Sequence, residues 1–124
     1  RSGTNLMAGE ESDYVDRALK AGFKLFYAPG ARLKHWVQAK RITRDYLGGI
    51  SFGNAVSRQL MKPHVGTIAA LRSIVGGVFL IFRHGLGQAV AMGLGNKGEA
   101  ILHMCRRRAG AGTLVGLFRR LRSG

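Results

Sequence analysis

The chain opens with apolar residues spaced as on one face of a helix. Val15, Ala18 and Leu19 recur at helical spacing, while charged side chains occupy the other faces. Gly22 follows where helices commonly end in a left-handed residue, a conformation that glycine adopts without strain. We therefore predict a short amphipathic helix that ends just before Gly22.

The pattern then changes to one that is typical of strands. Residues 25–27 are apolar and aromatic, a Pro-Gly pair at 29–30 marks a turn, and residues 31–35 have the composition of a second short strand. A helix followed by short strands predicts an α/β arrangement for residues 1–36.

A second helical pattern covers residues 38–62. Ile42, Tyr46 and Ile50 fall near one helical face, although several glycines in this stretch weaken or kink a helix. Pro63 is expected to stop it. We take residues 37–63 as a separate helical segment.

The remaining residues, 64–124, combine apolar runs with arginine clusters. Residues 67–82 hold a single charged side chain, and shorter apolar pieces follow at 89–94 and 100–105, separated by glycines. Arginines cluster at 106–108 and again near the end of the sequence. Because a spanning helix needs roughly 20 apolar residues, these short and interrupted pieces favour amphipathic helices on a membrane surface. A soluble helical hairpin with solvated arginines, or one or two true spans, stay open.

The net charge of +14 is unevenly distributed. Residues 1–45 carry nine basic and five acidic side chains, whereas residues 46–124 carry eleven basic side chains and one acidic. A field of this sign attracts anionic lipid headgroups, nucleic acid or a diphosphate. No helix-turn-helix, zinc-ligand spacing or aromatic RNA-binding signature accompanies the charge, which disfavours nucleic acid as a partner.

Short motifs follow one another over about thirty residues of the first part of the sequence, namely Gly9-Glu10-Glu11, Arg17, Ala21-Gly22-Phe23, Tyr27-Ala28-Pro29-Gly30-Ala31 and His35. In their order and spacing they resemble the C-terminal part of the catalytic domain of family 2 glycosyltransferases, which have the GT-A (Rossmann-like) fold. This resemblance implies an α/β fragment, with residues 1–36 completing a catalytic domain whose nucleotide-binding half lies upstream.

The resemblance also implies roles for individual residues. Glu11 would be the general base that deprotonates an acceptor hydroxyl, with Glu10 supporting it or binding the acceptor. His35 would complete a divalent metal site for Mn²⁺ or Mg²⁺ that the upstream half mostly holds. The donor phosphates or the acceptor would be bordered by basic and aromatic residues that follow, Arg41 or Arg44 with Tyr46.

The implied reaction transfers a sugar from a nucleotide-sugar donor to a hydroxyl acceptor with inversion, and the fragment alone is expected to be inactive. A lipid-linked or cell-envelope acceptor on the cytoplasmic face of the membrane would suit the basic tail.

Simpler interpretations compete with these roles. An acidic pair at a helix start is favoured by the helix dipole alone, and a histidine that ends a strand is commonly structural. The alternative function is a basic protein without enzymatic activity that binds membranes or nucleic acid.

Overall fold

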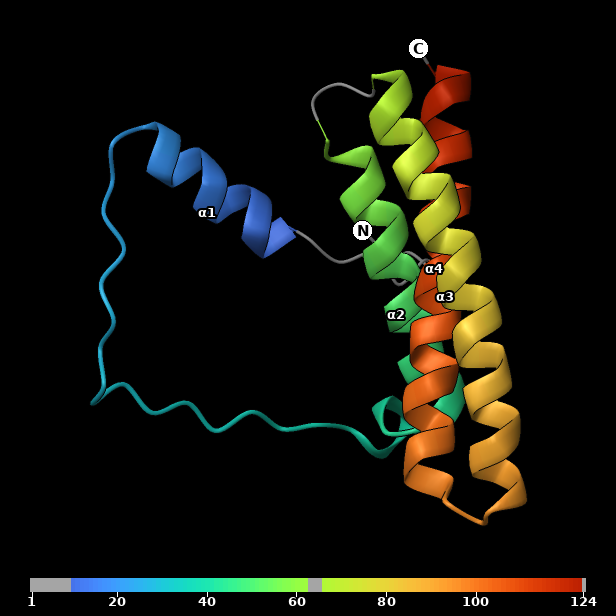
Figure 1. Ribbon diagram of the computed structural model, residues 1–124. Helices are drawn as coiled ribbons and strands as arrows, with labels where there is room; N and C mark the ends of the chain where they lie inside the picture. Colours follow the sequence, from blue (N-terminus) through green and yellow to red (C-terminus); the bar gives the residue numbers. More distant parts are fainter. Residues whose placement is uncertain (1–9, 63–65, 124) are drawn as a thin grey trace.

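The structure, a computed structural model, describes residues 10–62 and 66–123. Four α-helices and one short 3₁₀ helix lie within these ranges (Figure 1). In chain order they are α1 (Glu10–Lys20), η1 (Ala39–Arg41), α2 (Arg44–Leu60), α3 (Thr67–Gly93) and α4 (Lys97–Ser123).

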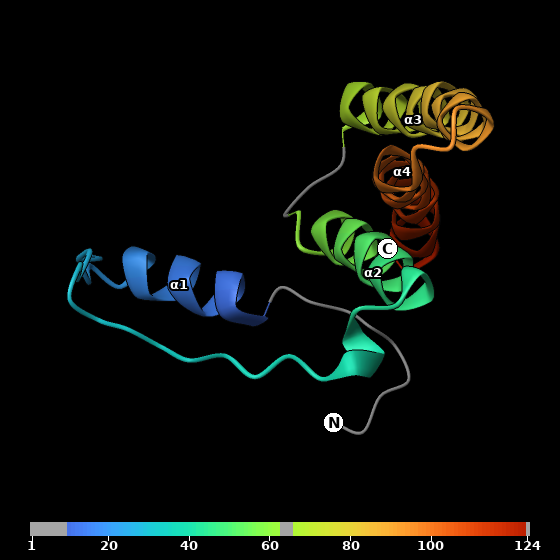
Figure 2. The same ribbon diagram turned by 90° about the horizontal axis from the view of Figure 1, so that it is seen from below.

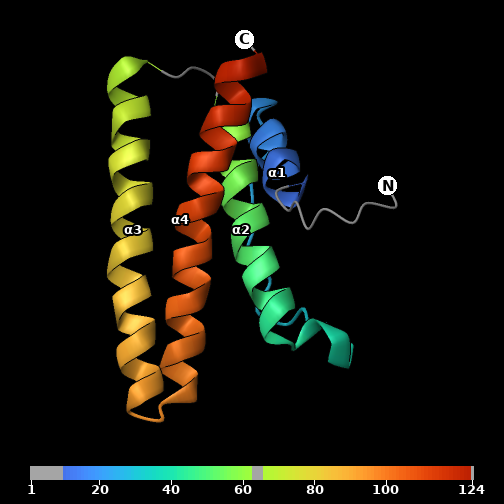
Figure 3. The same cartoon turned by 90° about the vertical axis from the view of Figure 1, so that its right-hand side faces the viewer.

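Helix α4 is the centre of the fold. It packs against α3 along one side and against α2 along the other (Figures 2 and 3). Helices α3 and α4 form an antiparallel hairpin, whereas α2 packs on the opposite flank of α4 (Figure 3). Among the described elements, α1 packs against none of the other helices.

Local signals explain where these helices begin and turn. Thr43 precedes α2, and its hydroxyl accepts a hydrogen bond from the backbone N–H of Tyr46 at 3.3 Å, which caps the helix. Asn96 does the same for α4 by accepting from the backbone N–H of Glu99 at 3.1 Å. Between α3 and α4 the chain reverses at Gly95, whose φ of +71° favours glycine.

Helix α1 ends as the sequence predicts. Gly22 has a φ of +88° and donates its N–H to the carbonyl of Leu19, and Phe23 donates to the carbonyl of Ala18. This pair of bonds is the Schellman motif, which satisfies carbonyls at a helix end. An exposed ion pair between Arg17 and Asp13, at 3.0 Å, adds one i,i+4 contact along the helix.

Glycines on α4 let its neighbours approach closely. A Cβ atom on Gly116 would lie 2.9 Å from the carbonyl oxygen of Val56 on α2, and one on Gly110 would lie 2.7 Å from the carbonyl oxygen of Gly77 on α3. These contacts are too short for a larger residue. The predicted break between residues 89–94 and 100–105 is confirmed by the turn at Gly95, but the prediction of short pieces is wrong, because the glycines at helix contacts lie inside the two continuous helices α3 and α4.

Polar contacts add to the packing of α2 on α4. Arg120 donates to the carbonyl oxygen of Gln59 at 2.9 Å, near the end of α2 where carbonyls lack helical partners. Arg108 pairs with Asp45 at 3.5 Å near the opposite end of α2. Helix α2 itself ends at Leu60, and the predicted stop at Pro63 lies outside the described residues.

The expected α/β fold is wrong. The described residues contain no strand, and the stretch between α1 and η1 is an extended, unpaired chain (Figure 1). Phe26 is 86% exposed and Trp36 is 88% exposed, so these side chains pack on no described core. Strand composition alone does not make a strand, because strands need ladder partners and an isolated pair is marginal in water.

Candidate functional site

The outward face of α3 carries a continuous row of large apolar side chains. Their exposed fractions range from 39% to 74%, and their spacing of three or four residues places them on one helical face. We call this row the apolar stripe; it consists of Ile68, Leu71, Val75, Val78, Phe79, Phe82, Leu86 and Val90. At 1.5 Å per residue the stripe is about 33 Å long.

The inward face of α3 is mixed in character. Its fully buried residues, Gly77, His84 and Ala91, are small or polar, and the half-buried Leu80 and Ile81 pack near Gly110 of α4. Ser73 also faces inward and accepts a weak hydrogen bond of 3.5 Å from the amide of Gln59 on α2. A helix in a soluble protein normally buries its large apolar side chains, whereas helices in contact with lipid pack through small and polar residues. Most of the large apolar side chains of α3 are therefore exposed on the outward face.

Arginines border the apolar stripe. Arg72 and Arg83 lie on α3 itself, and the guanidinium of Arg83 lies 5.9 Å from the centre of the Phe79 ring, within the range of a cation–π contact. On α4, Arg106 and Arg107 are exposed, and the stem of Arg107 passes close to Gly85 of α3. Long basic side chains in such positions can keep their stems in apolar surroundings and their charges in water.

A pair of histidines joins α3 to α4. The Nδ1 atoms of His84 and His103 are 2.9 Å apart, so one imidazole donates to the other, and their ring centres are 5.1 Å apart. His84 is only 5% exposed. Gly87 faces the His103 ring so closely that a side chain there would overlap it.

The environment of His84 disfavours a positive charge. Burial lowers the pKa of His84 below its ordinary value, and the nearby positive charges of His103, Arg106 and Arg83 lower it further. The separation of 2.9 Å between the two Nδ1 atoms leaves room for one proton between them.

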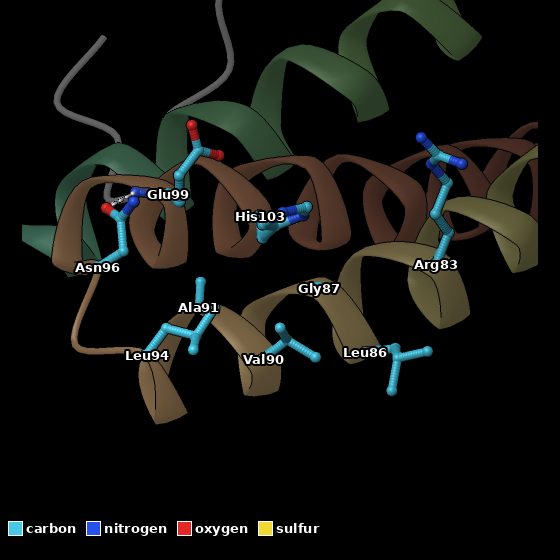
Figure 4. A pocket seen from close by; sticks show the side chains of 9 residues that line it. All are labelled: Arg83, Leu86, Gly87, Val90, Ala91, Leu94, Asn96, Glu99 and His103. Carbon is cyan, nitrogen blue, oxygen red and sulfur yellow. Dashed lines mark hydrogen bonds between the residues drawn. The ribbon is translucent and has the colours of Figure 1, made fainter.

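A pocket of about 440 Å³ opens beside the histidine pair, between α3 and the first turns of α4. Figure 4 shows Arg83 at one end, Asn96 and Glu99 at the other, and His103 between them. The lining from α3 is mainly apolar and includes Leu86 and Val90 of the apolar stripe. The pocket is therefore amphipathic and continuous with the stripe.

The residues predicted from the glycosyltransferase resemblance lie elsewhere. Glu10 and Glu11 are the first residues of α1, and their side chains lie outside the described part of the structure. His35 is exposed in the extended stretch before η1.

The predicted substrate-binding residues are near one another only because they are close in sequence. Arg41 ends η1, Arg44 begins α2, and both are exposed, whereas Tyr46 is half-buried in the first turn of α2. Helix α1, which carries the acidic pair, packs against neither element. No group of three or more His, Cys, Asp or Glu side chains suited to a metal ion occurs within residues 10–62 and 66–123. The catalytic, substrate and metal roles stay predictions.

No protein-family model, curated protein or solved structure matches this chain. With no strand among the described residues, the predicted identification as a GT-A fragment of a family 2 glycosyltransferase is wrong. By length and composition, α3 is the one described helix that could cross a membrane, and 17% of its most apolar window is buried in the fold. A proposal for the function therefore has to rest on the fold and on the outward-facing stripe of α3, since no known family supports one.

Proposed function

We propose that this protein binds the surface of an anionic membrane, with α3 lying in the interface and the apolar stripe turned toward the acyl chains. The observation that carries the proposal is the exposed apolar stripe of α3, which includes Phe79, Phe82 and Leu86, whereas the residues that the helix buries fully are small or polar, as at Gly77 and His84. Water does not favour this arrangement, but the boundary between headgroups and acyl chains does.

The position of Arg83 favours a helix that lies in the interface over one that crosses the bilayer. Helix α3 runs from Thr67 to Gly93, so Arg83 is three residues, or about 4.5 Å, from the middle of the helix. A spanning orientation would place this arginine near the bilayer centre, at a cost of about 3 kcal/mol on insertion scales. In the interface the same guanidinium reaches the headgroups at no such cost.

The arginine run of α4 supports the same orientation. Because α3 and α4 form an antiparallel hairpin, a spanning α3 would take residues 106–108 into the bilayer with it. An interfacial α3 leaves these arginines near anionic headgroups, where each contributes about 1 kcal/mol. Apolar burial and electrostatic attraction then act together, as in other interfacial helices.

The test is binding of the full chain to vesicles of two compositions. We expect saturable co-sedimentation with vesicles that contain phosphatidylserine, and weaker binding to vesicles of pure phosphatidylcholine. Binding to the phosphatidylserine vesicles should weaken as the salt concentration is raised, because salt screens the charges. Salt-sensitive binding to a polynucleotide, with no binding to either kind of vesicle, would assign the charge to nucleic acid. The predicted sugar transfer and the predicted cytoplasmic face are independent of this result.

A further inference from the structure

We infer that the pocket between α3 and α4 binds a single acyl chain with an anionic head, the head at Arg83 and the chain past His103 along Leu86, Val90 and Leu94. The inference rests on the proposed function, because it places one bound lipid at the edge of the apolar stripe. The ligand class is a monoalkyl or acyl anion, whether a free amphiphile or a lipid drawn from the bilayer.

The shape of the pocket fits one chain. Arg83 and Leu94 lie at opposite ends of the α3 lining, eleven positions apart, so the lining is about 16 Å long (Figure 4). The hydrocarbon core of a bilayer is about 30 Å thick, and one leaflet therefore contributes about 15 Å of chain. The apolar part of the lining, from Leu86 to Leu94, spans eight positions or about 12 Å, so it can cover most of one such chain while Arg83 lies at the head.

The charges of the pocket place the head. Arg83 makes no ion pair within the described residues, and its positive charge is reinforced by Arg106 near His84. Glu99, the acidic residue of the lining, lies at the far end from Arg83 (Figure 4). An anion is thus favoured at the Arg83 end and opposed at the Glu99 end, which orients the chain in one direction.

His103 gives the middle of the pocket a polar side. It lines the pocket between the Arg83 end and the Glu99 end, and its Nδ1 faces His84 (Figure 4). Gly87 leaves room for the His103 ring at the wall of the pocket. A bound chain therefore passes the His103 ring, which makes that ring a reporter of occupancy, while the anionic head is held at Arg83.

The route of entry also favours a lipid over a soluble metabolite. Leu86 and Val90 belong both to the pocket lining and to the apolar stripe. A chain that leaves the bilayer along the stripe can enter the pocket without crossing water. Inorganic phosphate would gain the contacts of the head but nothing from the apolar lining.

The first experiment uses decyl phosphate below its micelle-forming concentration, without vesicles, and follows the His84 and His103 ring signals by NMR. We expect one saturable site, with affinity at least about tenfold higher than for inorganic phosphate or an uncharged decyl glycoside. Arg83→Gln should weaken decyl phosphate binding about tenfold, because a charge-assisted contact is lost. Arg72→Gln is the matched control, since Arg72 lies on the same helix outside the pocket lining, and it should leave the affinity unchanged.

The second experiment separates a bilayer lipid from a free amphiphile. If the occupant comes from the bilayer, Arg83→Gln lowers the affinity for phosphatidylserine vesicles more than Arg72→Gln does. If both variants lose the same amount of vesicle affinity and decyl phosphate does not bind, the pocket inference is wrong while the proposed membrane binding stands. If vesicles are not bound but decyl phosphate is, the pocket takes a free amphiphile and the proposed membrane function fails.

Discussion

Replacing Phe82 with alanine tests the energetic contribution of the apolar stripe. Phe82 is 74% exposed, so its removal leaves no cavity in the fold, and alanine preserves the helix. Full burial of such a side chain contributes about 1.5–3 kcal/mol, and covering its exposed three quarters with lipid contributes roughly 1–2 kcal/mol. Because 1.4 kcal/mol is tenfold in affinity, Phe82→Ala should weaken vesicle binding about tenfold.

The assay is co-sedimentation with phosphatidylserine-containing vesicles over a range of lipid concentrations. Phe118→Ala is the control, since Phe118 is 66% exposed but lies on α4 outside the stripe. The control should change the affinity less than twofold, and neither variant should lower the free energy of unfolding by more than about 0.5 kcal/mol. An equal loss for both variants would refute the idea that α3 faces the lipid.

Three further predictions concern the stability of the fold, each measured by chemical denaturation. Gly77→Ala should destabilise the fold by about 1–3 kcal/mol, because its Cβ would lie 2.8 Å from the Leu114 side chain. Gly76→Ala, whose Cβ would meet no atom within 4 Å, should stabilise the fold by about 0.5–1 kcal/mol. Similar effects of the two substitutions would contradict the close approach of α3 and α4. The pKa of His84 is lowered by burial first and then by its charged neighbours, so the unfolded chain takes up a proton more readily and stability should fall as the pH drops below about 6.5. His84→Asn should flatten that slope, and an unchanged slope would assign the pH dependence to other groups. Thr43→Ala should cost about 1 kcal/mol through loss of the α2 cap, and a loss near zero would mean that water replaces the hydroxyl.

Local patterns in the sequence predict the local features of the fold. The end of α1 at Gly22 follows from glycine chemistry alone, and the structure confirms it with a φ of +88°. The start of α2 has an equally local cause, the hydroxyl of Thr43 that caps it, but the predicted helix began at residue 38, six positions before Arg44. Both signals depend on residues within one turn of the position that they specify.

The continuity of α3 and α4 could not be predicted in the same way. Glycine lowers helix propensity, which favours an interrupted segment when the sequence is considered alone. Gly77 and Gly110 instead lie where the two helices meet, and close packing there outweighs the propensity cost. Which glycines are contacts and which are breaks depends on a partner helix that the local sequence does not identify.

The predicted strands failed for a related reason. Residues 25–27 and 31–35 have strand composition, but no described segment offers them a ladder. Their aromatic side chains remain exposed, so composition alone did not determine the structure.

The histidine pair was also beyond reach of the sequence. His84 and His103 are nineteen positions apart and meet only because α3 and α4 are antiparallel. Zinc-ligand spacing does not identify them, because the two histidines have no third His, Cys, Asp or Glu beside them within the described residues. Helical register across the Gly95 turn is the signal that could have brought them together.

The most direct test of the central claim is the immersion depth of the apolar stripe in a bilayer. Spin labels would be placed one at a time at Leu71, Val75, Phe82 and Leu86, in a Cys105→Ser background, and their depth measured in phosphatidylserine-containing vesicles. An interfacial α3 predicts similar, shallow depths of about 5–10 Å at all four positions. Depths that rise to a maximum near Phe82 would show a spanning helix, and labels that stay accessible to water would show that the stripe does not enter the membrane.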